Sequence, residues 1–154
     1  MQTIQQVLEY IIPKTIELNN KYISSEIMEI NYSAIFCQNQ EEWENFNNQM
    51  ILLATIIDNT PTGPLYKFNE PVKTIIGDLQ LLKIRKYNKD HSQRGDADFT
   101  TKNYESFKNK YLEDTNHFNV IKRPNFEMVE LKDPDFNVMS YFSSIPLIIQ
   151  YGLS

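Results

Sequence analysis

Hydrophobic residues recur at helical spacing near the start of the chain. The pattern covers residues 2–22 and predicts a helix there. The apolar side chains on one side of this helix are Ile4, Val7, Leu8, Ile11 and Ile12. Pro13 lacks an amide hydrogen and interrupts the pattern, so we expect either a kink at this point or two short helices.

Alternation with a period of two then predicts a strand over 27–37, with Ile30, Tyr32, Ala34 and Phe36 on one face. Helical spacing returns over residues 41–55. The apolar stripe of that helix consists of Trp43, Phe46, Met50 and Leu53. Turn-forming residues at 58–64 predict a loop. Further strands are expected at 65–69 and 72–85, with breaks at Glu70-Pro71 and near Gly77.

The same order of elements then occurs a second time, after a polar link. The second set is a strand at 96–100, a helix at 103–113, and strands at 117–121, 126–131 and 137–142. Each half is therefore a β-α-β-β-β module, and duplication is the best single account of the chain. We expect an α+β fold and a single domain, 1–154. Its parts are an N-terminal helical segment, 1–25, and two modules, 26–88 and 94–154.

Composition excludes several functional classes. The net charge of −5 and the scattered basic residues disfavour nucleic acid as a partner. The longest apolar runs are too short to cross a bilayer, so no membrane is expected. Met1–Gln6 lacks the features of a secretory signal, and Cys37 is the only cysteine. A cytoplasmic location is therefore predicted.

Several sequence phrases resemble a known superfamily. The tandem modules and the segment 130–139 (Glu-Leu-Lys-Asp-Pro-Asp-Phe-Asn-Val-Met) are similar to the vicinal oxygen chelate, or glyoxalase-like, superfamily. Within that fold, the YecM family is the closest resemblance. It rests on the phrase at 65–72, the strand 32–37 ahead of Trp43, and a second-module strand that begins at Gly95. The similarity covers about residues 1–112.

The resemblance implies a curved mixed sheet around a cleft. In the enzymes of this superfamily, a divalent metal in the cleft is held by histidine and glutamate from the first and last strands of each module. The matching positions here are Tyr32, Lys83, Asp98 (or Asp96) and Ser140 (or Tyr141). A protonated lysine has no lone pair for a cation. A conventional metal site is therefore not expected, and no cofactor is predicted; a divalent metal is the alternative.

Lys83 is a cation within an apolar strand, and Asp96 and Asp98 lie on one face of another. We hypothesise that Lys83 with Asp98 or Asp96 replaces the charge of the metal and binds a small polar ligand, with Tyr32 and Ser140 also lining the cleft. The competing interpretation places Lys83 in solvent or in a structural ion pair. The acids Glu130, Asp133 and Asp135 are interpreted as turn chemistry, and His91 and His117 as loop or strand-edge residues.

Three functions remain open. The first is a protein that binds a small polar molecule without a conventional metal. The second is a metal-dependent lyase, isomerase or dioxygenase-like enzyme with a rearranged ligand set such as Asp96, Asp98 and Glu130. The third is a protein-interaction module with a vestigial cleft and an exposed apolar patch elsewhere, for instance on the 2–22 helix. The expected partners are a small-molecule ligand and, as an open alternative, a second copy of the chain in a homodimer.

Overall fold

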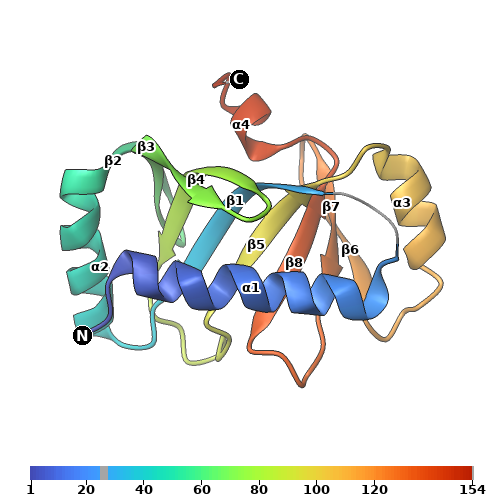
Figure 1. The fold of residues 1–154 in the computed structure, drawn as a ribbon, viewed down its shortest axis with the longest axis horizontal. Helices are drawn as coiled ribbons and strands as arrows, with labels where there is room; N and C mark the ends of the chain where they lie inside the picture. The colour runs from blue at the N-terminus through green and yellow to red at the C-terminus, as the bar shows by residue number, and fades with distance from the viewer. Residues whose placement is uncertain (25–27, 154) are drawn as a thin grey trace.

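The computed structural model describes residues 1–24 and 28–153. One long helix, α1, crosses the front of a broad sheet, with α2 at one end of the molecule and α3 at the other (Figure 1). The helices are α1 (Ile4–Tyr22), α2 (Gln40–Leu53), α3 (Tyr104–Tyr111) and the short α4 (Leu147–Gln150). None of the helices in the described ranges is long and apolar enough to cross a membrane.

Eight strands form one mixed sheet in the order β2-β3-β4-β1-β5-β8-β7-β6. The first-module strands are β1 (Glu29–Phe36), β2 (Ala54–Thr60), β3 (Gly63–Thr74) and β4 (Gly77–Arg85). The second-module strands are β5 (Gly95–Thr100), β6 (Phe118–Lys122), β7 (Glu127–Leu131) and β8 (Val138–Ser143). Both modules therefore have the predicted β-α-β-β-β order, and the predicted α+β fold class is confirmed.

The two modules meet at their first strands. β1 runs antiparallel to β5, and each of them has the last strand of its own module as a parallel neighbour, β4 for β1 and β8 for β5. The first and last strands of both modules thus lie side by side in the middle of the sheet. Any side chains that these four strands project from one face are brought together.

α1 is a single continuous helix with Pro13 inside it, so the predicted alternative of two short helices is wrong. Its start is fixed by a capping box, in which Thr3 and Gln6 each accept a hydrogen bond from the backbone amide of the other. Pro13 lies on the exposed side of the helix, where water can serve the carbonyl group that loses its partner. The opposite side packs on the central strands β5 and β8.

Gly95 allows α1 to approach the sheet closely. A Cβ atom at this position would lie 2.3 Å from the carbonyl oxygen of Ala34 and 2.6 Å from Ile11 Cδ1. Both distances are far below van der Waals contact. The second module begins with a glycine because β1 and α1 leave no space for a side chain.

The connections of the first module differ from the prediction. Residues 54–60, assigned from sequence to a helix end and a loop, form strand β2, which pairs with β3. β3 is continuous from Gly63 to Thr74, so the predicted break at Glu70-Pro71 is wrong and only a register shift occurs there. Pairing with β3 outweighed the turn-forming composition of residues 58–60. The turn between β2 and β3 therefore consists of Pro61 and Thr62 alone.

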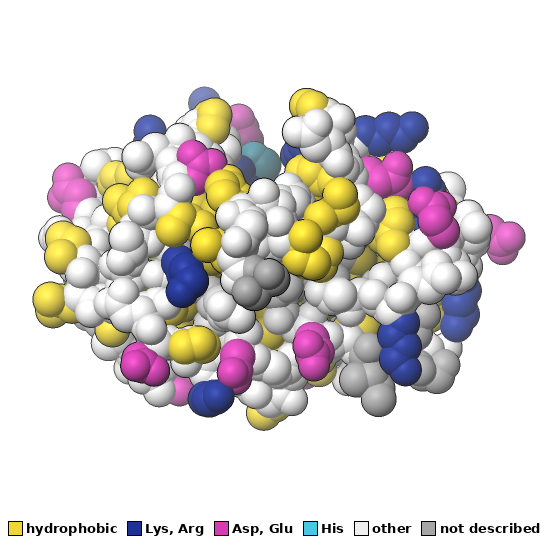
Figure 2. All heavy atoms as spheres, turned by 90° about the horizontal axis from the view of Figure 1, so that it is seen from above, with side chains coloured by type: hydrophobic (Ala, Val, Ile, Leu, Met, Phe, Trp, Pro, Cys, Tyr) yellow, Lys and Arg dark blue, Asp and Glu magenta, His cyan; other side chains and the backbone are white. Residues whose placement is uncertain are grey.

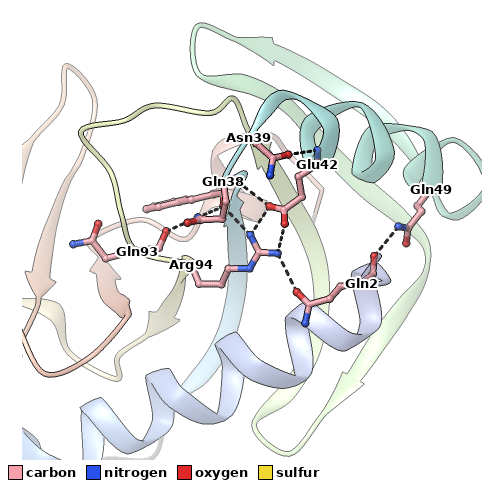
Figure 3. A network of polar contacts seen from close by, with 8 residues as sticks. Gln2, Gln38, Asn39, Glu42, Gln49, Gln93 and Arg94 are labelled. Carbon is pink, nitrogen blue, oxygen red and sulfur yellow. Dashed lines mark hydrogen bonds and ion pairs between the residues drawn. The ribbon is translucent and has the colours of Figure 1, made fainter.

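Arg94 links three elements just before β5 begins (Figure 3). Its guanidinium group donates to both carboxylate oxygens of Glu42 (2.5 and 3.0 Å), to the carbonyl oxygen of Phe36 (3.1 Å) and to Gln2 Oε1 (3.3 Å). The Arg94 and Glu42 side chains are only 10% and 17% exposed. This bidentate pair fixes the N-terminus of α2 against the junction between the two modules.

Candidate functional site

The two faces of the sheet have different chemistry. Helices α1, α2 and α3 bury the main apolar core against one face. The opposite face, which we call the carboxylate face, carries a small cluster of Ala34, Phe36 and Met139 with Tyr32 and Tyr141 packed against it. Two rows of cross-strand neighbours lie on this face. One row is Lys83, Ala34, Asp96 and Met139, and the other is Tyr32, Asp98, Tyr141 and Glu130.

Four of the five predicted site residues are therefore brought together: Tyr32, Lys83, Asp96 and Asp98. The fifth, Ser140, lies on the other face, where its hydroxyl group donates to the carbonyl oxygen of Thr15 in α1 (3.4 Å). The residue of β8 that faces the carboxylates is its neighbour Tyr141. A shift of one residue moves a side chain to the opposite face of a strand.

Asp98 is buried but fully supplied with hydrogen bonds. Its Oδ2 accepts from Ser143 Oγ (2.5 Å), and its Oδ1 accepts from the Ser143 amide (3.3 Å) and from Asn31 Nδ2 (3.2 Å). Burial raises the pKa of Asp98 to about 6, although these hydrogen bonds favour the ionised form. Asn31 reaches Asp98 because a bulge between Ile30 and Tyr32 shifts the register of β1.

That bulge also corrects the predicted face of Ile30. The sequence pattern placed Ile30 with Tyr32, Ala34 and Phe36, but Ile30 belongs to the core beneath the helices. An extra residue in one strand reverses the alternation on one side of it.

Asp96 is buried to 6% exposure, and its Oδ1 has no hydrogen-bond partner. Burial is the main reason that its pKa rises, to about 7; the charge of Asp98 acts in the same direction, whereas Arg85 and Lys83 oppose it. An unpaired buried carboxylate oxygen costs about 1–3 kcal/mol. Oδ1 of Asp96 is thus a buried acceptor without a partner among the described residues, whereas a backbone hydrogen bond from Ala34 supports the carboxylate.

Two cations of β4 face the same side. The Lys83 ammonium group is partly buried and donates to Thr62 Oγ1 (3.3 Å), and none of the ion pairs among the described residues includes it. Burial lowers the pKa of Lys83, and the positive charges of Arg85 and Arg123 lower it further, while Asp96 raises it. The Arg85 guanidinium group lies over the ring of Phe36, 4.4 Å from its centroid.

The two tyrosines border the carboxylates. Tyr141 donates to Glu130 Oε2 (2.7 Å), and burial raises its pKa well above the usual range. Burial also raises the pKa of Tyr32, with the charges of Asp96 and Asp98 adding to the effect. Both phenols therefore stay protonated at neutral pH and act as hydrogen-bond donors or acceptors.

The acids and histidines outside this face have structural roles. Asp133 accepts from Lys21 Nζ (2.8 Å) and from the Tyr22 hydroxyl group, which joins the end of α1 to the β7–β8 turn. His117 Nδ1 lies 2.8 Å from Asp114 Oδ2, and its ring lies 4.4 Å from that of Tyr22. Glu130, which the sequence analysis grouped with Asp133 and Asp135, is instead buried on the carboxylate face. Its assignment to turn chemistry was therefore wrong.

The donor set does not fit a conventional metal. Across residues 1–24 and 28–153, no group of three or more His, Cys, Asp or Glu side chains is placed to hold a metal ion. The positions matching the superfamily ligands supply one lysine, two phenols and a pair of aspartates. Lys83 repels a cation, and a phenol is a weak ligand unless it ionises.

Sequence reasoning missed three residues of this face, Asn31, Arg85 and Ser143, and it named Glu130 only as a ligand in the metal-dependent alternative. Alternation along β4 from Lys83 identifies Arg85 as a residue of the same face. Asn31 and Ser143 have no comparable signal, because a bulge and a strand end position them.

α4 lies against β1, and the Tyr151 hydroxyl group donates to Asp58 of β2. In Figure 2, which views the molecule from the α4 side, hydrophobic side chains gather toward the middle and most charged side chains lie near the edges. The pattern in the sequence did not predict α4. It contributes an apolar rim beside the first-module strands.

A separate groove of about 630 Å³ lies on the helical side of the sheet, between α1, the end of α2 and the β3–β4 hairpin. Its walls are mainly apolar, with Ile4, Leu8 and Ile12 on one side and Phe68 and Val72 on the other. Beside the groove, Leu52 and Ile75 are each 85% exposed. A contiguous exposed apolar patch commonly marks an interaction surface.

The duplicated modules, with their first and last strands in the middle of the sheet, define an α+β fold of two β-α-β-β-β modules that share one mixed eight-stranded sheet. The chain is similar to the solved structure of "Protein EC4020", with 12% identity over 96% of this chain and 89% of that chain and a TM-score of 0.71. It also resembles a glyoxalase/bleomycin resistance protein/dioxygenase superfamily member from Vibrio splendidus 12B01, with 8% identity, 75% and 97% coverage of the two chains, and a TM-score of 0.47. No family model and no curated protein matches the sequence. At these identities the likeness concerns the fold alone.

Proposed function

We propose that the carboxylate face binds a small polar molecule and does so without a conventional metal site. The observation that supports this most directly is the unpaired Oδ1 of buried Asp96. A hydrogen-bond donor on a ligand would relieve the cost of that unpaired oxygen, whereas a neighbouring side chain does not. Tyr32 and Tyr141 supply further polar contacts next to it.

The test compares wild type with Asp96→Asn in thermal-shift titrations with glycerol, ethanolamine and L-lactate. We expect at least one of these compounds to raise the melting temperature of wild type and to lose about tenfold in affinity for the variant, since one charge-assisted hydrogen bond contributes about 1.5–3 kcal/mol. Asp90→Asn, in an exposed loop, is the matched control. Equal binding by wild type and Asp96→Asn, or no binding by wild type, would reject the proposal.

The enzyme alternative has less support. It required three donors converging on one metal, and Asp96, Asp98 and Glu130 do not form such a group in the described ranges. Membership of the YecM family stays a proposal that rests on the sequence phrases at 32–37 and 65–72. A cytoplasmic location is likewise proposed, supported by the single cysteine, Cys37, and testable by cell fractionation.

A second candidate function is self-association through the groove beside α1, with a second copy of the chain as the occupant. The observation that favours it is the run from Met50 to Ile57, which contains no charged residue and leaves Ile51 and Leu52 70% and 85% exposed. Two copies of an acidic protein repel each other, so close packing is favoured where apolar residues are exposed, and Lys73 in the groove wall can offset part of the charge of Glu9 and Glu70. The mass of the protein in solution tests this candidate.

A further inference from the structure

Two cations of the carboxylate face, Lys83 and Arg85, make no ion pair within the described residues. Lys83 is absent from the ion pairs of the described ranges, and Arg85 contacts the ring of Phe36 rather than an acid. Arg123, in the β6–β7 turn of the other module, contributes to the positive potential at Lys83. These cations therefore come from both modules, and the carboxylates of Asp96 and Asp58 oppose their effect at Lys83.

The unpaired acceptor lies beside these cations. Lys83, Ala34 and Asp96 are consecutive cross-strand neighbours on β4, β1 and β5. Because neighbouring strands are about 4.8 Å apart, the backbones at Lys83 and Asp96 are separated by about 10 Å. Ala34 between them has the smallest side chain of the row, so the two polar groups are separated by a short apolar floor.

Asp96 and Lys83 do not satisfy each other across that floor. An ion pair needs nitrogen and oxygen within about 4 Å, and Lys83 instead donates to Thr62 Oγ1. A molecule only a few bonds long can contact both groups at once. It needs an anionic end for Lys83 and Arg85 and a donor end for Asp96 Oδ1.

We propose that the ligand of this face is a small organic acid that also carries a hydroxyl or amino group. Its carboxylate or phosphate group contacts Lys83 and Arg85, and its hydroxyl or amino group donates to Asp96. This inference rests on the proposed function, which requires only that Asp96 contacts a polar ligand. An arginine fork and a lysine ammonium group together suit either oxyanion.

Three matched compounds separate the two ends of the ligand in calorimetric titrations of the full chain. L-lactate carries both groups, propionate lacks the hydroxyl group, and ethanolamine lacks the acid. We expect L-lactate to bind at least tenfold more tightly than either of the others, because only L-lactate contacts both ends of the row. Phosphoethanolamine, which carries a phosphate and an amino group but no carboxylate, tells whether a phosphate can take the place of the carboxylate.

The variant Lys83→Met removes the cation and keeps the length of the side chain. We expect it to lose at least tenfold in lactate affinity and to leave the affinity for ethanolamine unchanged. Lys14→Met, on α1 at the other face of the sheet, is the control and should bind as wild type does. Melting temperatures of the free variants show whether each one folds.

The outcomes distinguish this inference from the proposed function. Suppose that ethanolamine binds in an Asp96-dependent manner and lactate binds no better. The face then still binds a polar ligand, but the inferred contact of an anionic group with Lys83 and Arg85 is wrong. The inference also fails if Lys83→Met and wild type bind lactate equally. If none of the compounds binds wild type, both proposals fail.

Discussion

Burial destabilises the ionised form of the Asp96 carboxyl group relative to the protonated form. In the unfolded chain an aspartate has a pKa of about 3.9, whereas burial raises the pKa of Asp96 to about 7 in the folded protein. Between these values the folded protein holds the proton more tightly than the unfolded chain does. Stability therefore falls as the pH rises through this window and levels off above it.

We expect the wild-type protein to unfold at a lower urea concentration at about pH 8 than at about pH 5, and Asp96 contributes about 2–3 kcal/mol of this difference in unfolding free energy. Asp98, with a pKa raised to about 6, acts in the same direction. Asp96→Asn should remove most of the difference, because asparagine does not ionise. Urea titrations at the two pH values measure it.

Asp90→Asn is the matched substitution at an exposed position and should keep the wild-type pH dependence. If Asp96→Asn keeps it too, the Asp96 carboxyl group is not the source. The pKa of about 7 for Asp96 would then be wrong.

At the scale of elements, Arg94 adds a side-chain contact between the modules to the pairing of β1 with β5. It binds Glu42 of α2, the end of β1 and Gln2 ahead of α1, directly before β5. We expect Arg94→Met to lower the unfolding free energy by about 3 kcal/mol, because the mostly buried Glu42 carboxylate loses its partner. Chemical denaturation measures the loss.

The comparison is Lys73→Met, which breaks the exposed pair between Lys73 and Asp78. Exposed pairs contribute less than about 1 kcal/mol, so this variant should be nearly as stable as wild type. Similar losses in the two variants would mean that Arg94 does not hold the modules together.

For the whole molecule, the groove beside α1 leads to a prediction about its oligomeric state. If a second copy covers the groove, sedimentation should show a mass that rises with concentration toward twice 18.2 kDa. Leu52→Glu places a carboxylate on the exposed apolar surface and should shift the protein to the monomer, with at least a tenfold weaker association.

Ile149→Glu changes an equally large side chain that is 55% exposed on α4, away from the groove. It should leave the association unchanged. A wild-type protein that stays monomeric at every concentration, or a Leu52→Glu variant that associates like wild type, contradicts the homodimer.

Local patterns were sufficient for much of the fold. The helical spacing near residue 4, the strand that begins at Gly95 and the repeated order of elements were all readable from the sequence. So was the shared face of Asp96 and Asp98, because side chains two residues apart point to the same side of a strand. Lys83 was recognisable as an unusual cation between leucines and an isoleucine.

The tertiary structure decided what depends on pairing between distant strands. The register between β5 and β8 places Tyr141, one residue beyond Ser140, on the carboxylate face. A bulge at Asn31 directs the Ile30 side chain toward the core. Residues 54–60 form a strand because they pair with β3, although their local sequence pattern predicts a helix end and a loop. Alternation along a strand is local chemistry, whereas the partner, the register and the lack of a partner for Asp96 arise only when strands far apart in the chain meet.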